Sequence, residues 1–162
     1  MKTGFNLLFI LLLLMPFLSA CSNDKENTPI EQAKLIRLSI NNNNSDQLRT
    51  LSSLPLLVST QEWTSSDDGY GFVLGDSKQI ELTTDKEFQE HFKATINSIH
   101  IQGEQVISDI SLNIFTEELK DQIKRWDSLN LYLLKRGEGD VEHIVLLGLN
   151  KNTNKLRAIY IN

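Results

Sequence analysis

The sequence predicts an α+β domain in which an antiparallel sheet, with a C-terminal three-stranded meander, packs against three or four helices. Two capping-box motifs, each followed by apolar residues at helical spacing, indicate helices. Apolar segments bounded by glycine, asparagine and aspartate indicate strands. Helices and strands do not alternate regularly, which favours α+β over α/β. We find no internal repeat, so residues 29–162 are expected to form a single domain.

The first two helices are expected at residues 29–40 and 45–53. A capping box begins at Thr28, and the proline that follows it suits the first turn of a helix. The four asparagines at 41–44 favour a turn and end the first helix. Pro55 is expected to end the second.

Three strands are expected next, at residues 56–63, 70–74 and 78–83. The polar segment 64–69 separates the first two as a turn, and the glycine-containing segment 75–77 separates the last two.

A second capping box begins at Thr84 and predicts another helix. Alternation at residues 105–115 predicts a strand, and Thr116 opens a last helix with Trp126 on its inner face. The other residues expected to face the core here are Phe88, Phe92, Thr95, Ile96, Val106, Ile110, Leu112, Ile114, Leu119 and Ile123.

The C-terminal strands, at residues 129–135, 141–150 and 155–161, are separated by short polar turns and predict an antiparallel meander. Residues 143–147 of the middle strand are almost all apolar. Both faces of this strand are therefore expected to be covered, with the strand in the interior of the sheet.

Residues 1–20 have the pattern of an export signal. Lys2 and the amino terminus form a short positive end, and residues 5–18 are apolar apart from Asn6. A stable membrane span requires about 20 apolar residues, so this segment is too short for one and has the length of a signal-peptide core.

Leu18, Ser19, Ala20 and Cys21 match the lipobox, and the chain therefore resembles the bacterial lipoproteins as a class. The resemblance implies diacylglycerol on the Cys21 thiol, cleavage between Ala20 and Cys21, and acylation of the new amine. These acyl chains are the only groups expected on the protein, with no other cofactor. The alternatives are an ordinary signal peptide with a chance cysteine, or an uncleaved anchor.

The anchor makes the bilayer a partner and places the domain in the periplasm, because several acyl chains hold a protein stably. Ser22 and Asn23 follow the cysteine; by analogy with enterobacterial lipoproteins, they imply the outer membrane rather than the inner one. Residues 21–28 form the tether. Its seven polar residues reach at most about 25 Å, which keeps the domain close to the membrane.

Without its leader the chain carries 15 basic and 21 acidic side chains. It has no basic stripe, so we expect neither a nucleic-acid partner nor polybasic attraction to anionic lipid. Cys21 is the only cysteine, and once it is acylated no disulfide or thiolate metal site is possible.

No catalytic or metal-binding pattern is present in the sequence. The three histidines, His91, His100 and His143, have no ligand spacing between them, and His143 is expected to be a buried or strand-end side chain. Asp67 and Asp68 precede a glycine, a pattern that favours a hairpin turn over a cation loop. No nucleophile elbow or phosphate loop occurs, and we expect no enzyme.

The candidate interface residues are Trp63, Asp67, Asp68 and Tyr70, which lie in a segment with three aromatic rings around an acidic turn. Such rings are typical anchors of protein interfaces. The alternative, which the alternation favours, is that the rings enter the core while the acids remain in solvent.

Two functions are consistent with these observations. The first is a non-catalytic, membrane-anchored accessory or assembly factor of the cell envelope that binds another protein. The second is an immunity or inhibitor lipoprotein that neutralises a toxin or hydrolase, because acidic charge steers a protein toward basic partners. An enzyme would require clustered polar side chains in a pocket, and a small ligand on the sheet is a further alternative.

Overall fold

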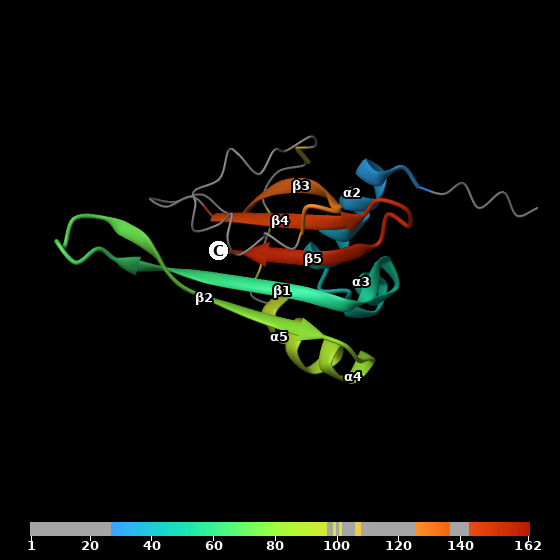
Figure 1. Cartoon of the computed structure of the whole chain (residues 1–162), viewed down its shortest axis with the longest axis horizontal. Coiled ribbons are helices and arrows are strands. Elements are labelled where there is room, and N and C mark those ends of the chain that lie inside the picture. Colours follow the sequence, from blue (N-terminus) through green and yellow to red (C-terminus); the bar gives the residue numbers. More distant parts are fainter. Residues whose placement is uncertain (1–26, 97–98, 100, 102–105, 108–125, 137–142) are drawn as a thin grey trace, which may run out of the picture.

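The computed structural model consists of a five-stranded sheet with helices on one face and a long hairpin that extends from the body (Figure 1). The structure describes residues 27–96, 99, 101, 106–107, 126–136 and 143–162. The expected leader, the cleavage site between Ala20 and Cys21, and most of the tether lie outside these residues. Within the described part, no helix has the length and hydropathy to cross a bilayer.

The sheet contains β1 (Ser52–Ser65), β2 (Phe72–Leu82), β3 (Leu129–Arg136), β4 (His143–Asn150) and β5 (Leu156–Ile161). The helices are α2 (Pro29–Asn41), α3 (Ser45–Leu51) and a continuous segment of α4 (Asp85–Glu87), the π-helical η2 (Phe88–Phe92) and α5 (Lys93–Ile96). The order of strands across the sheet is β2-β1-β5-β4-β3.

Both capping boxes form as expected. At the start of α2, the Glu31 amide donates to Thr28 Oγ1 (3.3 Å) and the Thr28 amide donates to Glu31 Oε2 (2.8 Å). Thr84 and Glu87 make the same reciprocal bonds before α4. Each box satisfies amide donors that the first helical turn would otherwise leave without an acceptor.

The second helix ends earlier than expected, at Leu51, and β1 begins at once with Ser52. Pro55 therefore lies inside β1, after a cis peptide bond, and does not mark the end of the helix. The strand tolerates this proline because its ladder with β2 starts at Leu56 and its register with β5 is interrupted between Ser52 and Leu57. A missing amide donor removes no ladder bond at such a position.

The expectation of a purely antiparallel sheet is wrong, because β1 runs parallel to β5, with Val58 opposite Ile159. The C-terminal meander is confirmed: β4 lies between β3 and β5 and is antiparallel to both. The sheet is therefore mixed, and the parallel pair joins the β1–β2 hairpin to the meander.

The two strands expected at 70–74 and 78–83 are one strand, β2. The register places Gln61 opposite Ser77 and then Trp63 opposite Leu74, so two residues of β2 stand opposite one residue of β1. The segment around Gly75 is thus a β-bulge rather than a turn. A bulge bends a strand without ending it.

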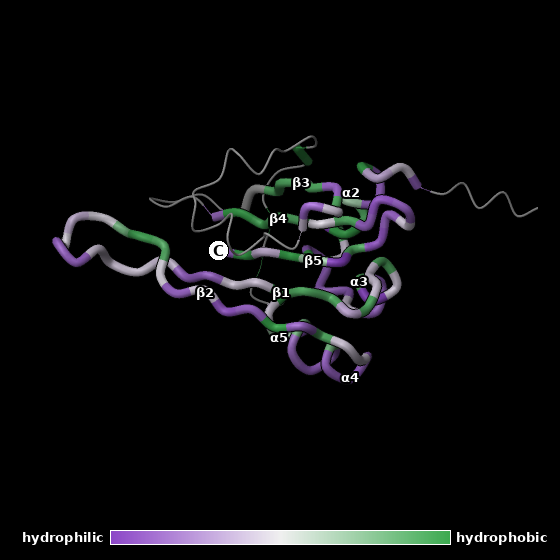
Figure 2. Tube along the Cα trace, in the orientation of Figure 1, coloured by the Kyte–Doolittle hydropathy of each residue, from purple (hydrophilic) through white to green (hydrophobic). Residues whose placement is uncertain are grey.

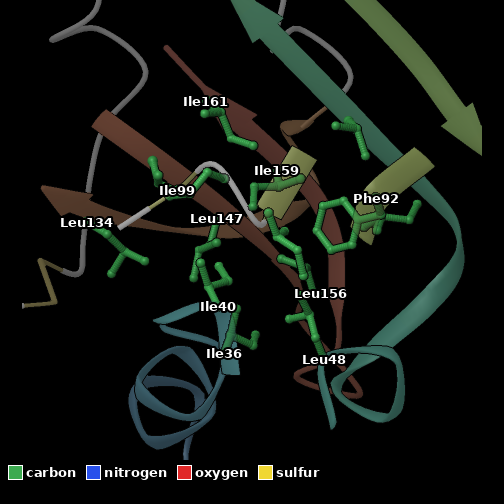
Figure 3. Close-up of a cluster of buried hydrophobic side chains, with 14 of the residues drawn as sticks. Ile36, Ile40, Leu48, Phe92, Ile99, Leu134, Leu147, Leu156, Ile159 and Ile161 are labelled. Carbon is green, nitrogen blue, oxygen red and sulfur yellow. The ribbon is translucent and has the colours of Figure 1, made fainter. Parts of the chain in front are cut away.

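One face of the sheet packs against α2, α3 and η2, as Figure 3 shows for side chains from each of these elements and from β3, β4 and β5. Phe88, Phe92 and Ile96 are buried there as expected, and Thr95 is half-buried. The principal buried residues of this face are Ala33, Ile36, Ile40, Leu48, Leu56, Val58, Leu134, Val145, Leu147, Leu156 and Ile159.

The opposite face carries a second cluster that includes Trp126, Leu146 and Tyr160. Trp126 is buried as expected, although the rest of its expected helix lies outside the described residues. Of the strand expected at 105–115, the structure describes Val106, which packs on the first core, and Ile107, which forms a bridge with Leu133. The other expected core positions, Ile110, Leu112, Ile114, Leu119 and Ile123, also lie outside the described residues.

Candidate protein-binding hairpin

The β1–β2 hairpin continues beyond the end of its neighbouring strand. The last β1–β5 pair is Thr60 with Ile161, whereas β1 goes on to Ser65. At about 3.3 Å per residue, the strand extends about 16 Å past this pair before the loop begins. Figure 1 shows the hairpin at one end of the long axis and the start of α2 at the other. We call residues 62–76 the hairpin tip.

Gln61 holds the base of the hairpin tip to the sheet. The Tyr160 hydroxyl donates to Gln61 Oε1 (2.9 Å), and Gln61 Nε2 donates to the Gly75 carbonyl in the bulge (2.6 Å). Tyr160 is fully buried, and desolvation raises its pKa to about 12. A side chain from β1 thus links β5 to the point where β2 bends away from the body.

The bulge itself requires a residue without a side chain. A Cβ on Gly75 would lie 2.8 Å from Thr64 Cγ2 and 3.2 Å from the Glu62 carbonyl oxygen. A larger residue would require the Thr64 side chain to move and the Glu62 carbonyl to shift. The glycine therefore fixes how closely the strands approach as they leave the sheet.

The loop at the end of the hairpin is held by its own polar groups. The Ser66 amide donates to the Gly71 carbonyl (3.2 Å), and the Tyr70 amide donates to Asp68 Oδ1 (3.0 Å). The Ser66 hydroxyl also donates to Asp68. The two bonds that Asp68 accepts, from the Ser66 hydroxyl and the Tyr70 amide, lower the pKa of its carboxyl. Gly69 and Gly71 adopt positive φ angles of 75° and 90°, which side chains disfavour. Asp68 therefore maintains the loop.

Apolar side chains are exposed on the hairpin tip. Tyr70, Phe72 and Val73 are 88%, 54% and 48% exposed. The expectation that the rings enter the core is thus wrong for Tyr70 and Phe72, because this part of the hairpin extends past the neighbouring strand. Trp63 and Leu74, which stand opposite each other, are half-buried. Figure 2 shows the resulting hydrophobic stretch near the end of the hairpin.

Alternation along the strands places Trp63, Phe72 and Leu74 on one face of the hairpin and Val73 on the other. The Trp63 indole nitrogen is buried and has no hydrogen-bond acceptor among the described residues. All four predicted interface residues, Trp63, Asp67, Asp68 and Tyr70, thus lie on the same projection as Phe72 and Val73.

The charges of the hairpin tip all have the same sign. Glu62, Asp67, Asp68 and Asp76 are exposed, and no lysine or arginine occurs between residues 61 and 77. No described residue forms a salt bridge with these four carboxylates. They stand on both sides of the apolar residues along the hairpin, two near its base and two in the loop.

Two hollows lined by described residues are small for a ligand pocket. A groove of about 260 Å³ between the hairpin and η2–α5 is lined by Lys78, Glu90 and exposed His91, among others. A second, of about 160 Å³, lies beside Trp126 and Arg157. Pockets for small organic ligands usually measure about 300–1,000 Å³. In the described ranges, no group of three or more His, Cys, Asp or Glu residues could hold a metal ion.

His143 is the first residue of β4, and its Nδ1 lies 3.2 Å from the Asn162 carbonyl oxygen. It is therefore a half-buried, strand-end side chain, as expected. His100 lies outside the described residues.

No protein-family model matches the chain, and no curated protein or solved structure is significantly similar to it. The hairpin tip, with its exposed rings and unbalanced charge, is the most distinctive surface in the described part of the chain.

Proposed function

We propose that this protein is a lipid-anchored envelope protein, attached through Cys21, that binds another protein with its hairpin tip. The observation that carries this proposal is the exposure of Tyr70, Phe72 and Val73 on a projecting, internally bonded hairpin. Aromatic residues bury a large area with little loss of side-chain freedom, and they are enriched among the residues that dominate protein interfaces.

The position of the hairpin suits an anchored protein. The start of α2 and the hairpin tip lie at opposite ends of the long axis (Figure 1). With a tether of at most about 25 Å between Cys21 and Thr28, the first end stays near the bilayer. The hairpin tip is then directed away from that membrane, so its partner is a protein in the periplasm rather than a neighbour embedded beside it. This placement supports an accessory or assembly role without catalysis.

An inhibitor is the second candidate. The tip is convex, and Ser66 and Asp68 hold its loop in one conformation, so it could enter the cleft of a toxin or hydrolase with little ordering cost. For an inhibitor, deletion of the gene is harmful only when the target is active. For an assembly factor, deletion impairs the complex whether or not any toxin is present.

The test is site-specific photo-crosslinking in intact cells. Benzoylphenylalanine replaces Tyr70 in the full chain and, as a matched control, Leu38, which is 44% exposed on α2. We expect a discrete protein adduct from position 70 and none from position 38. The paired change Tyr70→Ser and Phe72→Ser, tested by co-purification, should remove the partner. Equal adducts from both positions, or none from position 70, would refute binding through the hairpin.

The anchor is tested separately, by intact-mass analysis of the membrane-extracted protein. We expect the mass of a chain that begins at Cys21 and carries diacylglycerol and an N-acyl group. The Cys21→Ser variant should lack both groups and leave the membrane fraction. An unmodified thiol would contradict the proposed attachment.

A further inference from the structure

We infer that the partner surface is an apolar recess bordered by lysine and arginine side chains on both sides. This inference rests on the proposed function, because it concerns the same hairpin tip. It follows from the order in which apolar and acidic residues are placed along the hairpin.

The apolar part of the surface is in the middle. Phe72 and Val73 are in the first two positions of β2, and Tyr70 precedes them in the loop. Their side chains are exposed and are not part of either apolar cluster formed by the described residues. A recess in a partner would remove these side chains from water, which is the main source of affinity at the centre of an interface.

Carboxylates bracket this apolar part. Asp76 lies in the bulge at the base and Glu62 stands opposite it, and Asp67 lies in the loop at the far end; all three are exposed. Docking would bring these charges close to the rim of the recess. An acidic rim would repel these carboxylates, and a neutral rim would displace their water without replacing its interactions. Lysines and arginines would complement the carboxylates. The rim therefore has to be basic at two places, about the length of the hairpin tip apart.

The same charges argue against two other occupants. An anionic bilayer repels acidic residues, so the exposed rings do not constitute a membrane-insertion site. A second copy of the chain is also disfavoured, because the whole sequence has a net charge of −5 and two hairpin tips would meet with like charge. A basic protein is the occupant that the charge favours.

The experiment uses the protein that crosslinks through position 70, purified and titrated against the full chain at several salt concentrations. The neutral variant combines Glu62→Gln, Asp67→Asn and Asp76→Asn; Asp68 is kept because it holds the loop. We expect affinity to fall roughly tenfold at low salt, mainly through slower association, and the salt dependence to flatten. The matched control, Glu90→Gln, changes an exposed carboxylate of η2 away from the hairpin tip and should alter neither the affinity nor its salt dependence.

The apolar half of the inference is tested with Tyr70→Ser and Phe72→Ser together. We expect a loss of at least about 30-fold in affinity with the salt dependence retained, as for residues at the centre of an interface. Leu38→Ser removes a comparably exposed apolar side chain elsewhere and should have no effect. Circular dichroism of each variant confirms that the domain is folded.

The outcomes separate the two proposals. If a partner is captured but binds the neutral variant with unchanged affinity and salt dependence, the basic rim is wrong and hairpin binding stands. If position 70 captures no protein, both fail. Vesicles of phosphatidylcholine and phosphatidylglycerol at 3:1, tested with the Cys21→Ser chain, should not bind it. Binding that requires Tyr70 and Phe72 would overturn the inference in favour of a membrane.

Discussion

Replacing Gln61 by leucine is expected to destabilise the domain more than replacing its partner Tyr160 by phenylalanine. Gln61 accepts from the buried Tyr160 hydroxyl (2.9 Å) and donates to the Gly75 carbonyl (2.6 Å). Tyr160→Phe removes the hydroxyl together with its bonds to Gln61 and Asn162, whereas Gln61→Leu keeps a buried hydroxyl that has lost its acceptor and removes the donor to the Gly75 carbonyl. The two substitutions also act on the same bond, so their effects should not add.

The magnitudes follow from the cost of buried polar groups. Loss of the hydroxyl's bonds with Gln61 and Asn162 in Tyr160→Phe should lower the free energy of unfolding by about 1–2 kcal/mol. Gln61→Leu adds the desolvation of the hydroxyl and the loss at Gly75, for a total of about 2–4 kcal/mol. In the double variant the hydroxyl is gone, so its cost should be less than the sum of the single costs by about 1–2 kcal/mol.

Urea unfolding of the four proteins, followed by tryptophan fluorescence and circular dichroism, measures this coupling. Tyr70→Phe serves as the control: it removes a hydroxyl at an 88% exposed position and should change stability by less than about 0.5 kcal/mol. Hydrogen exchange at the amides of the hairpin tip should also become faster in Gln61→Leu. Additive single effects, or unchanged exchange in the hairpin, would refute the role assigned to Gln61.

Three other perturbations test the fold. Burial raises the pKa of Tyr160 to about 12. The contribution of Tyr160 to the free energy of unfolding should therefore be constant below about pH 10 and decrease by about 2–3 kcal/mol between pH 10 and 12. An equal decrease in Tyr160→Phe would contradict this. In Gly148→Ala, the new Cβ would lie 2.7 Å from Leu129 Cδ1 and 3.2 Å from Trp126 Cε3. We expect the free energy of unfolding to fall by about 1–3 kcal/mol and tryptophan emission to change. A variant as stable as the original protein would exclude this packing. Thr84→Ala should lower the melting temperature, because it removes a helix cap that contributes about 1 kcal/mol to stability. An unchanged melting temperature would exclude this role for Thr84.

Elements with local signals could be predicted from the sequence. The capping boxes at Thr28 and Thr84 mark where their helices begin, because cap and helix are neighbours along the chain. The meander is also predictable, since only short polar sequences separate its strands. The apolar middle strand correctly indicated that β4 lies in the sheet interior.

Features that depend on distant residues could not be predicted. The parallel pairing of β1 with β5 joins Val58 to Ile159, and no local pattern encodes that register. Likewise, the local sequence around Gly75 predicts a turn. In the structure β1 continues past this segment and pairs on both sides of it, so the segment is a bulge. The hydrogen bond from Tyr160 to Gln61 exists only because that pairing brings the two residues together.

The composition of the candidate interface is visible in the sequence, but the exposure of its rings is not. Aromatic and acidic composition is a local property, and it indicates Trp63, Asp67, Asp68 and Tyr70 as candidates. A ring is buried only where other residues cover it. The hairpin tip lies beyond the last pair of β1 with β5, so its rings are exposed. The role of Asp68 in the loop also depends on the backbone fold around it.

The parallel pairing of β1 with β5 also determines the order in which the domain can assemble. The ribosome makes β1 about a hundred residues before its partner, and the pair from Val58 to Ile159 cannot form until the last strand has emerged. Contacts between such distant segments slow folding. A chain exported as proposed here can therefore complete its sheet only after its last strand has been made, and any shorter chain lacks the strand that joins the hairpin to the meander.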